Sequence, residues 1–188
     1  MHQGPDISPC RTRTYLFDRV IEIEPSDAQR YRELRLRGLQ DHPEAFGEIA
    51  STFEAKTTEE IAQQMVTQRS LGGFTLVALS KTGDMIGTAS LGLNAPGKFH
   101  HRASLWGMYV IPEARGQNVG RFLIQDLLER ARQIDGIEQV HLAVTSSNIS
   151  ALKLYKRMGF VTYGIDPRAL KLDGQYFDEC LMVRLLAE

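Results

Sequence analysis

The chain contains few cysteines and no long uninterrupted apolar run. Cys10 and Cys180 are the only cysteines among 188 residues, and no Cys-x-x-Cys spacing joins them. We expect both to remain thiols in a reducing cytosol, with a disulfide between them as the open alternative. No run approaches the ~18 apolar residues of a membrane span, and residues 1–15 lack the apolar core of a signal peptide. These absences predict a cytoplasmic protein without a cysteine-bound metal.

A surplus of either charge is also absent. The 22 Lys and Arg residues stand against 23 Asp and Glu residues, a formal net charge of −1. Four arginines crowd into residues 30–37. At about 100° per residue, however, Arg30 and Arg37 fall on one side of a helix while Arg32 and Arg35 fall on the opposite side. Without a single basic stripe, we expect neither nucleic acid nor a membrane as a partner.

Length and periodicity predict the organisation of the chain. A hydrophobic fraction of 43% suffices for one core, so we expect a flexible tail over residues 1–14 and a single domain over 15–188. Apolar alternation and β-branched runs predict strands at residues 18–25, 74–80, 85–94, 101–111, 139–146, 160–164 and 176–186. Helical periodicity predicts helices at residues 26–40, 57–70, 119–134 and 148–159.

Local signals support several of these boundaries. Ser26 or Asp27 can cap the first helix, and Gly38 lies near its C-terminal end. Thr57 and Glu60 form a capping-box pattern, whereas residues 41–56 read as irregular. The order of elements predicts a mostly antiparallel sheet with one parallel βαβ crossover in its middle and helices on its faces.

The hexapeptide RGQNVG, residues 115–120, joins a predicted strand to a predicted helix. The first N–H groups of a helix lack partners within the helix and carry partial positive charge, so such a junction suits a pyrophosphate. Glycines allow close approach of an anion to the backbone. On these six residues alone, an ordinary tight turn with solvated arginines remains equally open. The glycines are Gly116 and Gly120, and the side-chain donors in and beside the loop are Arg115, Gln117, Asn118 and Arg121.

From Ser104 to Gly164 the sequence resembles the GNAT superfamily of acetyl-CoA-dependent N-acetyltransferases. Its cofactor motif reads Arg or Gln, two residues, Gly, one residue, then Gly or Ala, and WGMYVIPEARGQNVGRFLI matches its length, proline and Arg-Gly-Gln start. P-loop and dinucleotide fingerprints do not match. Asn118 replaces a usual glycine, and asparagine tolerates the left-handed backbone best among other residues, so we expect binding to be retained.

A second stretch, HLAVTSSNISALKLYKRMGFVTYG, resembles the next strand and helix of the same superfamily. An asparagine opens the helix there and a tyrosine follows two turns on. Asn148 and Tyr155 lie seven positions apart, on one helix face, where they can serve one ligand. Taken singly, the asparagine would be only an N-cap and the tyrosine only a core aromatic.

The resemblance implies a fold, a donor and a reaction. The fold is α/β of the GNAT type, with a mixed, mostly antiparallel seven-stranded sheet, about four helices and a central parallel βαβ crossover. The donor is acetyl-CoA, without a metal, and the acetyl group passes directly to a primary amine of a small molecule or peptide. Tyr155 would be the catalytic acid, and Asn148 would orient the pantetheine arm or a water. The implied cofactor-binding residues are Met108, Tyr109, Val110, Arg115, Gly116, Gln117, Asn118, Val119, Gly120, Arg121, Asn148 and Tyr155.

The general base is left open by the sequence. Many relatives carry a glutamate at about the position of Gly107, and its absence leaves Glu113, His100 and His101 as candidates. The missing glutamate and Asn118 also keep a second hypothesis open, a non-catalytic sensor or interaction module that binds acetyl-CoA. Tyr155 argues against it.

The acceptor wall is expected in residues 41–55. Phe46 and Phe53 could line a pocket and Glu44, Glu48 and Glu54 could attract a cationic amine. Alternatively the aromatic rings only pack and the acids are solvated. The pattern does not distinguish an amino acid, a polyamine, an aminoglycoside or a protein N-terminus. Exposure of the last predicted strand could support a homodimer.

Overall fold

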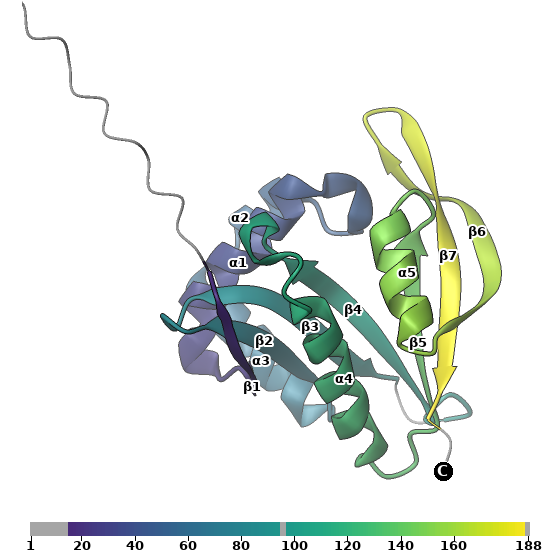
Figure 1. Ribbon diagram of the computed structural model, residues 1–188, viewed down its shortest axis with the longest axis horizontal. Coiled ribbons are helices and arrows are strands. Elements are labelled where there is room, and N and C mark those ends of the chain that lie inside the picture. The colour runs from purple at the N-terminus through teal and green to yellow at the C-terminus, as the bar shows by residue number, and fades with distance from the viewer. Residues whose placement is uncertain (1–14, 95–96, 187–188) are drawn as a thin grey trace, which may run out of the picture.

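The computed structural model describes residues 15–94 and 97–186, where seven strands form one sheet in the order β1-β2-β3-β4-β5-β7-β6 (Figure 1). The predicted tail and Cys10 lie outside the described residues. The strands are β1 (Phe17–Glu22), β2 (Phe74–Ser80), β3 (Met85–Leu93), β4 (Arg102–Val110), β5 (Gln139–Thr145), β6 (Val161–Leu172) and β7 (Gln175–Leu185). The α-helices are α1 (Ala28–Asp41), α2 (Ala50–Glu54), α3 (Thr58–Ser70), α4 (Val119–Arg132) and α5 (Ile149–Arg157).

The sheet has the predicted mixed topology. All neighbouring strands pair antiparallel except β4 and β5, which are parallel and joined by α4. Helices α4 and α5 cover one face of the sheet, and α1 and α3 cover the other (Figure 1). This arrangement confirms the expected fold class and its central crossover. The additional helix is the short α2, whose five residues are too few for periodicity to reveal within the stretch read as irregular.

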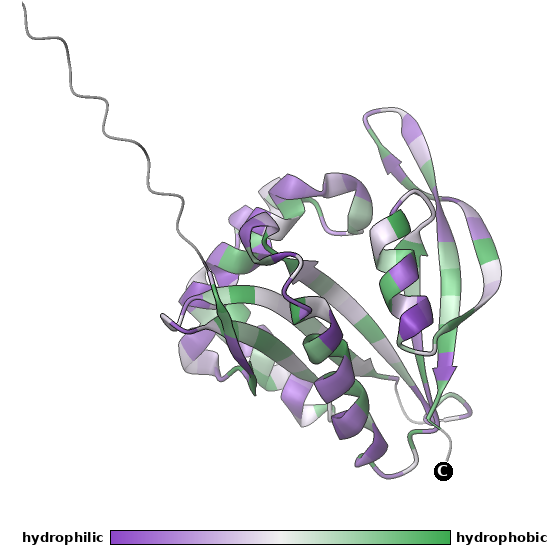
Figure 2. Ribbon diagram, viewed as in Figure 1, coloured by the Kyte–Doolittle hydropathy of each residue, from purple (hydrophilic) through white to green (hydrophobic). Residues whose placement is uncertain are grey.

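Apolar side chains lie where the helices meet the sheet. Every residue of β2 is buried, because helices cover both of its faces. Figure 2 shows the apolar positions along the strands, while the outer side of α4 is hydrophilic. Phe122, expected on the buried face of α4, instead stacks on Phe17 of β1 with 4.9 Å between ring centroids. Within the described ranges, no helix is long and apolar enough to cross a membrane.

One of the two predicted helix starts, that of α3, has the side-chain cap that the sequence predicted. The Thr57 hydroxyl accepts from the Glu60 N–H at 3.2 Å, and the Glu60 carboxylate accepts from the Thr57 N–H at 2.7 Å, a complete capping box. Of the two predicted caps of α1, Asp27 occupies the N-cap position at the end of a 3-10 turn, Pro25–Asp27, but its side chain makes no capping hydrogen bond to this helix. The helix also continues past Gly38. A Cβ there would come within 3.0 Å of the Tyr109 ring, so the glycine permits close packing of α1 on β4.

The C-terminal hairpin differs from its prediction. β6 extends to Leu172, well past the predicted end at residue 164. Its extension contains Pro167 and a register shift at Arg168, whose φ is +57°, and an edge strand tolerates both. β7 pairs with β5 on one side and β6 on the other. β7 is therefore an interior strand and the sheet edges are β1 and β6, so a homodimer, which stays a prediction, could not form by adding a strand to β7.

One side chain attaches β1 to the start of α4. Gln117 accepts a hydrogen bond from the Phe17 N–H at 3.0 Å and donates one to the Tyr15 carbonyl at 2.6 Å. The amide thus satisfies backbone groups of an edge strand that lies about 100 positions away in sequence.

We predict that Gln117→Ala lowers the free energy of unfolding by about 1–2 kcal/mol, because two backbone groups lose their partner. Urea denaturation of both proteins measures this. Gln125→Ala is the matched control, since that exposed amide bonds only the neighbouring Glu129 side chain, and its effect should stay within about 0.5 kcal/mol. Equal effects of the two substitutions would contradict the role of Gln117.

Candidate active site

The site lies where β4 and β5 separate. These two strands pair only through Arg102–Ser104 with residues 139–141, and then diverge (Figure 1). A β-bulge in β4 marks the beginning of the gap. Ser90 faces Trp106 and Thr88 faces Tyr109, so two residues of β4 oppose Ala89 alone. One of the two, Gly107, has φ +66°, a left-handed backbone that glycine adopts without strain.

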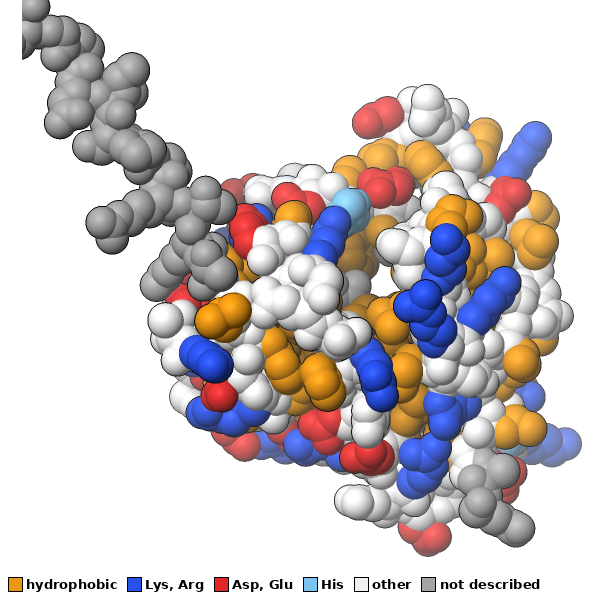
Figure 3. Space-filling model, viewed as in Figure 1, with side chains coloured by type: hydrophobic (Ala, Val, Ile, Leu, Met, Phe, Trp, Pro, Cys, Tyr) orange, Lys and Arg blue, Asp and Glu red, His pale blue; other side chains and the backbone are white. Residues whose placement is uncertain are grey.

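Two adjoining cavities occupy this gap. The larger, about 470 Å³, is lined by β4, β5, α5, the loop at residues 45–48, and single residues from α1 and β7. The other, about 380 Å³, follows β4 to the loop before α4. Met108, Asn148 and Leu154 line both. Figure 3 shows the surface hollowed between α4 and α5, with Lys and Arg side chains on its rims. Such a basic rim suits an anionic ligand.

The structure gathers most of the predicted cofactor-binding residues at the second cavity. Gln117 does not line it, because its side chain is bound to β1, and only its backbone N–H is left for a ligand. Tyr155 lines the larger cavity instead. The predicted residues that line the second cavity are Met108, Tyr109, Val110, Arg115, Gly116, Asn118, Val119, Gly120, Arg121 and Asn148.

The loop before α4 has the backbone geometry of an anion cradle. Asn118 is the N-cap of α4 with φ +60°, the left-handed conformation that the sequence predicted. Gly116 has φ +81° and open space where a Cβ would stand. A Cβ on Gly120 would lie 3.0 Å from Leu154 and 3.1 Å from Met108, so this glycine brings α4 close to β4 and α5. The unpaired N–H groups of the first helical turn therefore face the groove at short range, which fits a pyrophosphate.

The charged member of the loop is held by neighbours. Arg115 donates to the Val110 carbonyl at 3.2 Å, and its guanidinium lies 2.9 Å from Nε2 of His42. These contacts hold the Arg115 side chain beside the second cavity. There a phosphate could replace His42 as the partner of the guanidinium.

Asn148 and Tyr155 each make structural contacts and also line the larger cavity. The side-chain Oδ1 of Asn148 caps α5 by accepting from the Ala151 N–H at 3.1 Å, and it also accepts from the Ser150 hydroxyl. Its amide nitrogen remains available to a ligand in either cavity. Tyr155 is 5% exposed and packs edge-on against Phe160. Burial raises the pKa of the Tyr155 phenol above its ordinary value of about 10, so the phenol stays protonated at neutral pH.

The three candidates for the general base lie elsewhere. Glu113 pairs with Arg37 at 2.7 Å, and the hydrogen bond from that guanidinium lowers the pKa of the carboxyl. His100 and His101 precede β4, at the end opposite the bulge. None of the three lines either cavity.

Part of the expected acceptor wall lines the larger cavity, and its role with an acceptor stays a prediction. Phe46 and Glu48 line the larger cavity, whereas Phe53 is buried in the core and Glu54 is exposed. The Glu44 carbonyl accepts from the Thr145 hydroxyl at 2.9 Å and so ties this loop to β5 across the gap.

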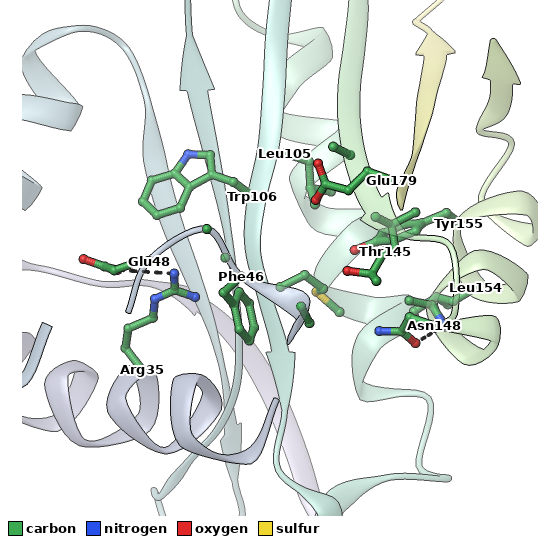
Figure 4. A pocket seen from close by; sticks show the side chains of 17 residues that line it. Arg35, Phe46, Glu48, Leu105, Trp106, Thr145, Asn148, Leu154, Tyr155 and Glu179 are labelled. Carbon is green, nitrogen blue, oxygen red and sulfur yellow. Dashed lines mark hydrogen bonds and ion pairs between the residues drawn. The ribbon is translucent and has the colours of Figure 1, made fainter. Parts of the chain in front are cut away.

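Two charged residues at the larger cavity escaped the sequence reasoning. Arg35 lies on the apolar stripe of α1, a position that its spacing from Tyr31 and Gly38 could have revealed. Glu179 lies opposite Thr145 in the β5–β7 register and points into the cavity (Figure 4). Burial, and then the facing Asp166, raise the pKa of Glu179. No local pattern could have found Glu179, because only the pairing of β7 with β5 brings it there.

Comparison with known proteins identifies the family. Residues 36–160 match the profile described as the acetyltransferase (GNAT) family. The chain belongs to this GNAT family. The family is one of acetyltransferases, and the resemblance read from the sequence is confirmed.

Curated relatives match about half of this chain. The L-methionine sulfoximine/L-methionine sulfone acetyltransferase of Pseudomonas paraeruginosa is 32% identical over 107 residues, 57% of this chain and 62% of that protein. The streptothricin acetyltransferase of Streptomyces lavendulae is 34% identical over 92 residues, 49% of this chain and 47% of that protein. The chain thus spans less than two thirds of these two relatives.

Solved structures share the fold over nearly the whole chain. A GNAT acetyltransferase from Streptococcus pneumoniae superposes with a TM-score of 0.80 at 22% identity, covering 89% of this chain and 98% of that one. The yncA protein of Salmonella typhimurium, determined with its cofactor acetyl-CoA, gives a TM-score of 0.78 at 21% identity and covers 92% and 95%.

We predict that Gly120→Glu weakens acetyl-CoA binding at least about 10-fold. The added side chain collides with Leu154 and Met108 and places a carboxylate beside the phosphates. Calorimetric titration measures the affinity, and circular dichroism checks the fold. Asn118→Gly is the control in the same loop, because glycine keeps the left-handed backbone, and its affinity should stay within about twofold. Wild-type affinity in Gly120→Glu would refute the cradle.

Proposed function

We propose that this chain is an N-acetyltransferase that moves the acetyl group of acetyl-CoA directly to a primary amine of a small molecule. The observation that carries the proposal is the pair of adjoining cavities. One begins at the N-terminus of α4, the other ends at Tyr155 and Glu179, and Met108 lies on both. A donor stretched along the first cavity would present its thioester at the entrance of the second.

The residues of the chain divide into binding and proton-transfer roles. The loop before α4 holds the pyrophosphate, and the backbone of residues 108–110 bonds the amides of the pantetheine arm. Backbone N–H groups near the bulge at Met108 stabilise the charge that develops on the carbonyl oxygen. Asn148, already fixed by its capping bonds, orients the arm with its amide nitrogen.

Tyr155 and Glu179 complete the proton balance. The amine nitrogen bonds to the carbonyl carbon as the carbon–sulfur bond breaks, the departing sulfur takes the Tyr155 proton, and Glu179 accepts the proton from the amine. Two described carboxylates line the cavity. Glu48 is paired with Arg35 and Lys56, whereas no described basic side chain forms an ion pair with Glu179. Glu179 would thus accept the proton in place of the glutamate that many relatives carry at about the position of Gly107.

The first experiment is calorimetric titration with acetyl-CoA, followed by a thiol-release assay over amino acids, polyamines, aminoglycosides and peptides. The relatives named above act on small molecules, so we expect saturable binding and thiol release with a small amine. Binding without release over the whole panel would favour a non-catalytic acetyl-CoA sensor. Absence of binding would overturn both functions.

Tyr155→Phe should lower kcat about 100-fold with acetyl-CoA affinity nearly unchanged, because only the proton donor is removed. Stopped-flow detection of the released thiol gives kcat, and calorimetry gives the affinity. Tyr163→Phe, an exposed phenol on β6, is the matched control and should keep wild-type turnover. Unchanged turnover in Tyr155→Phe would remove this residue from the mechanism.

Glu179→Gln should lower kcat/KM and change its pH dependence. In the wild type, kcat/KM falls as pH drops through the raised pKa of Glu179, because the protonated carboxyl no longer accepts a proton. The variant should lack this acidic limb and follow only the titration of the amine. Asp166→Asn removes the facing charge, so its acidic limb should move to lower pH. If Glu179→Gln retains the acidic limb, another group is the base.

A further inference from the structure

Arg35 occupies a position on α1 that would suit an apolar residue. It is 5% exposed and belongs to the buried stripe of the helix with Tyr31, Leu34 and Gly38. A guanidinium is permanently charged and carries five N–H donors, so its burial is costly unless acceptors surround it.

The acceptors around Arg35 are too few. Its Nη2 lies 3.4 Å from a carboxylate oxygen of Glu48, at the outer limit of a hydrogen bond, and its guanidinium lies 4.6 Å from the ring centre of Phe46. Its Nη1 is buried and has no hydrogen-bond partner among the described residues. The guanidinium therefore retains unused donors beside the cavity that it lines.

The charges around Arg35 are also unbalanced. The Glu48 carboxylate is shared with Lys56, whose Nζ lies 2.7 Å away. Two cations thus face one carboxylate, and the cluster of Arg35, Glu48 and Lys56 carries one excess positive charge. One monovalent anion would neutralise the cluster, whereas a dianion would leave an excess negative charge beside Glu48.

Arg35 lies close to the proposed point of reaction. Its Nη1 is 3.8 Å from the position that a Cβ on Gly107 would take, and Gly107 directly precedes Met108 in the bulge. Figure 4 shows the guanidinium between Glu48 and Phe46 on one side of the cavity, with Tyr155, Thr145 and Asn148 on the other.

We propose that Arg35 binds a carboxylate of the acceptor, so that the substrate is an amino acid whose amine and carboxylate are separated by only one or two carbons. The inference rests on the proposed function and names its substrate class. A planar guanidinium matches a carboxylate with two parallel hydrogen bonds.

The short separation follows from the geometry. The carboxylate must come within about 3 Å of the guanidinium, and the amine within about 3–3.5 Å of the thioester carbon near Met108. Because Arg35 and Met108 are neighbours across Gly107, a long linker between the two groups would not fit. Glu179, on the opposite side of the cavity, offers a carboxylate for the ammonium before transfer. The two ends of the cavity thereby complement a zwitterion.

The test compares proteinogenic L-amino acids with their primary amides, which keep the amine and lose the carboxylate charge. We expect wild-type kcat/KM for the best amino acid to exceed that for its amide about 100-fold. In Arg35→Met this ratio should fall to about one, chiefly through loss of the amino acid. Arg35→Lys keeps a charge at this position without the planar fork, and the ratio should be intermediate.

A binding measurement separates this inference from the proposed function. Each amino acid and its amide are titrated calorimetrically into the protein saturated with coenzyme A, where no transfer occurs. A preference for binding the amino acid that depends on Arg35 supports the inference even if no amine is acetylated. Absence of acetylation would contradict only the proposed function. Arg32→Met is the control on the same helix, because that partly buried guanidinium lines neither cavity and bonds the Glu54 and Lys56 carbonyls. It should keep the wild-type ratio.

Two results would overturn the inference. One is a wild-type enzyme that binds and acetylates amides as well as the amino acids. The other is an Arg35→Lys or Arg35→Met protein that is folded, binds acetyl-CoA as the wild type does, and prefers the amino acid by the full wild-type ratio. In the latter case Arg35 would only hold the loop at residues 45–48 through Glu48 and Phe46.

Discussion

The separation of β4 from β5 is the constraint on which the rest of the site depends. Beyond three parallel residue pairs, the facing edges of β4 and β5 no longer hydrogen-bond to each other. Backbone N–H and C=O groups cannot stay buried without partners, so this gap must hold solvent or a ligand. The bulge at Gly107 and Met108 turns one strand away, and the N-terminal ends of α4 and α5 come to rest on either side. An extended ligand with amides and phosphates suits such a gap.

The walls of the gap come from segments that are distant in sequence. The loop after α1 contributes Phe46 and Glu48, and the Thr145 hydroxyl of β5 holds that loop through the Glu44 carbonyl. β7 contributes Glu179 because it pairs with β5 along the whole length of that strand. The same antiparallel pairing that stabilises the C-terminal half therefore sets the position of a carboxylate in the cavity. Stability and the proposed chemistry here depend on one register.

Signals that depend on local backbone geometry could be read from the sequence. Asn118 was expected in a left-handed conformation and Asn148 at a helix start, and both are confirmed, because each depends only on residues within one turn. The roles of Gln117 and Glu179 could not be read, since their partners lie on other strands. The extent of β6 was also missed, because Pro167 and its polar neighbours do not look like a strand without the pairing to β7. Sequence reasoning therefore predicted residues that line the second cavity, whereas it missed the two charged residues Arg35 and Glu179 of the larger one.

Arg35 shows how an apparent cost to stability can indicate a ligand. A leucine on the buried stripe of α1 would avoid the desolvation of a guanidinium, and removing such buried charges often stabilises a protein. In a fold held only by packing, an arginine with an unsatisfied N–H would be a defect. Beside a cavity, the same unsatisfied donors lower the energy of any complex that supplies the missing acceptor. The incomplete hydrogen bonding of Arg35 therefore favours a binding role over a purely structural one, since Glu48 already has Lys56 as a closer partner.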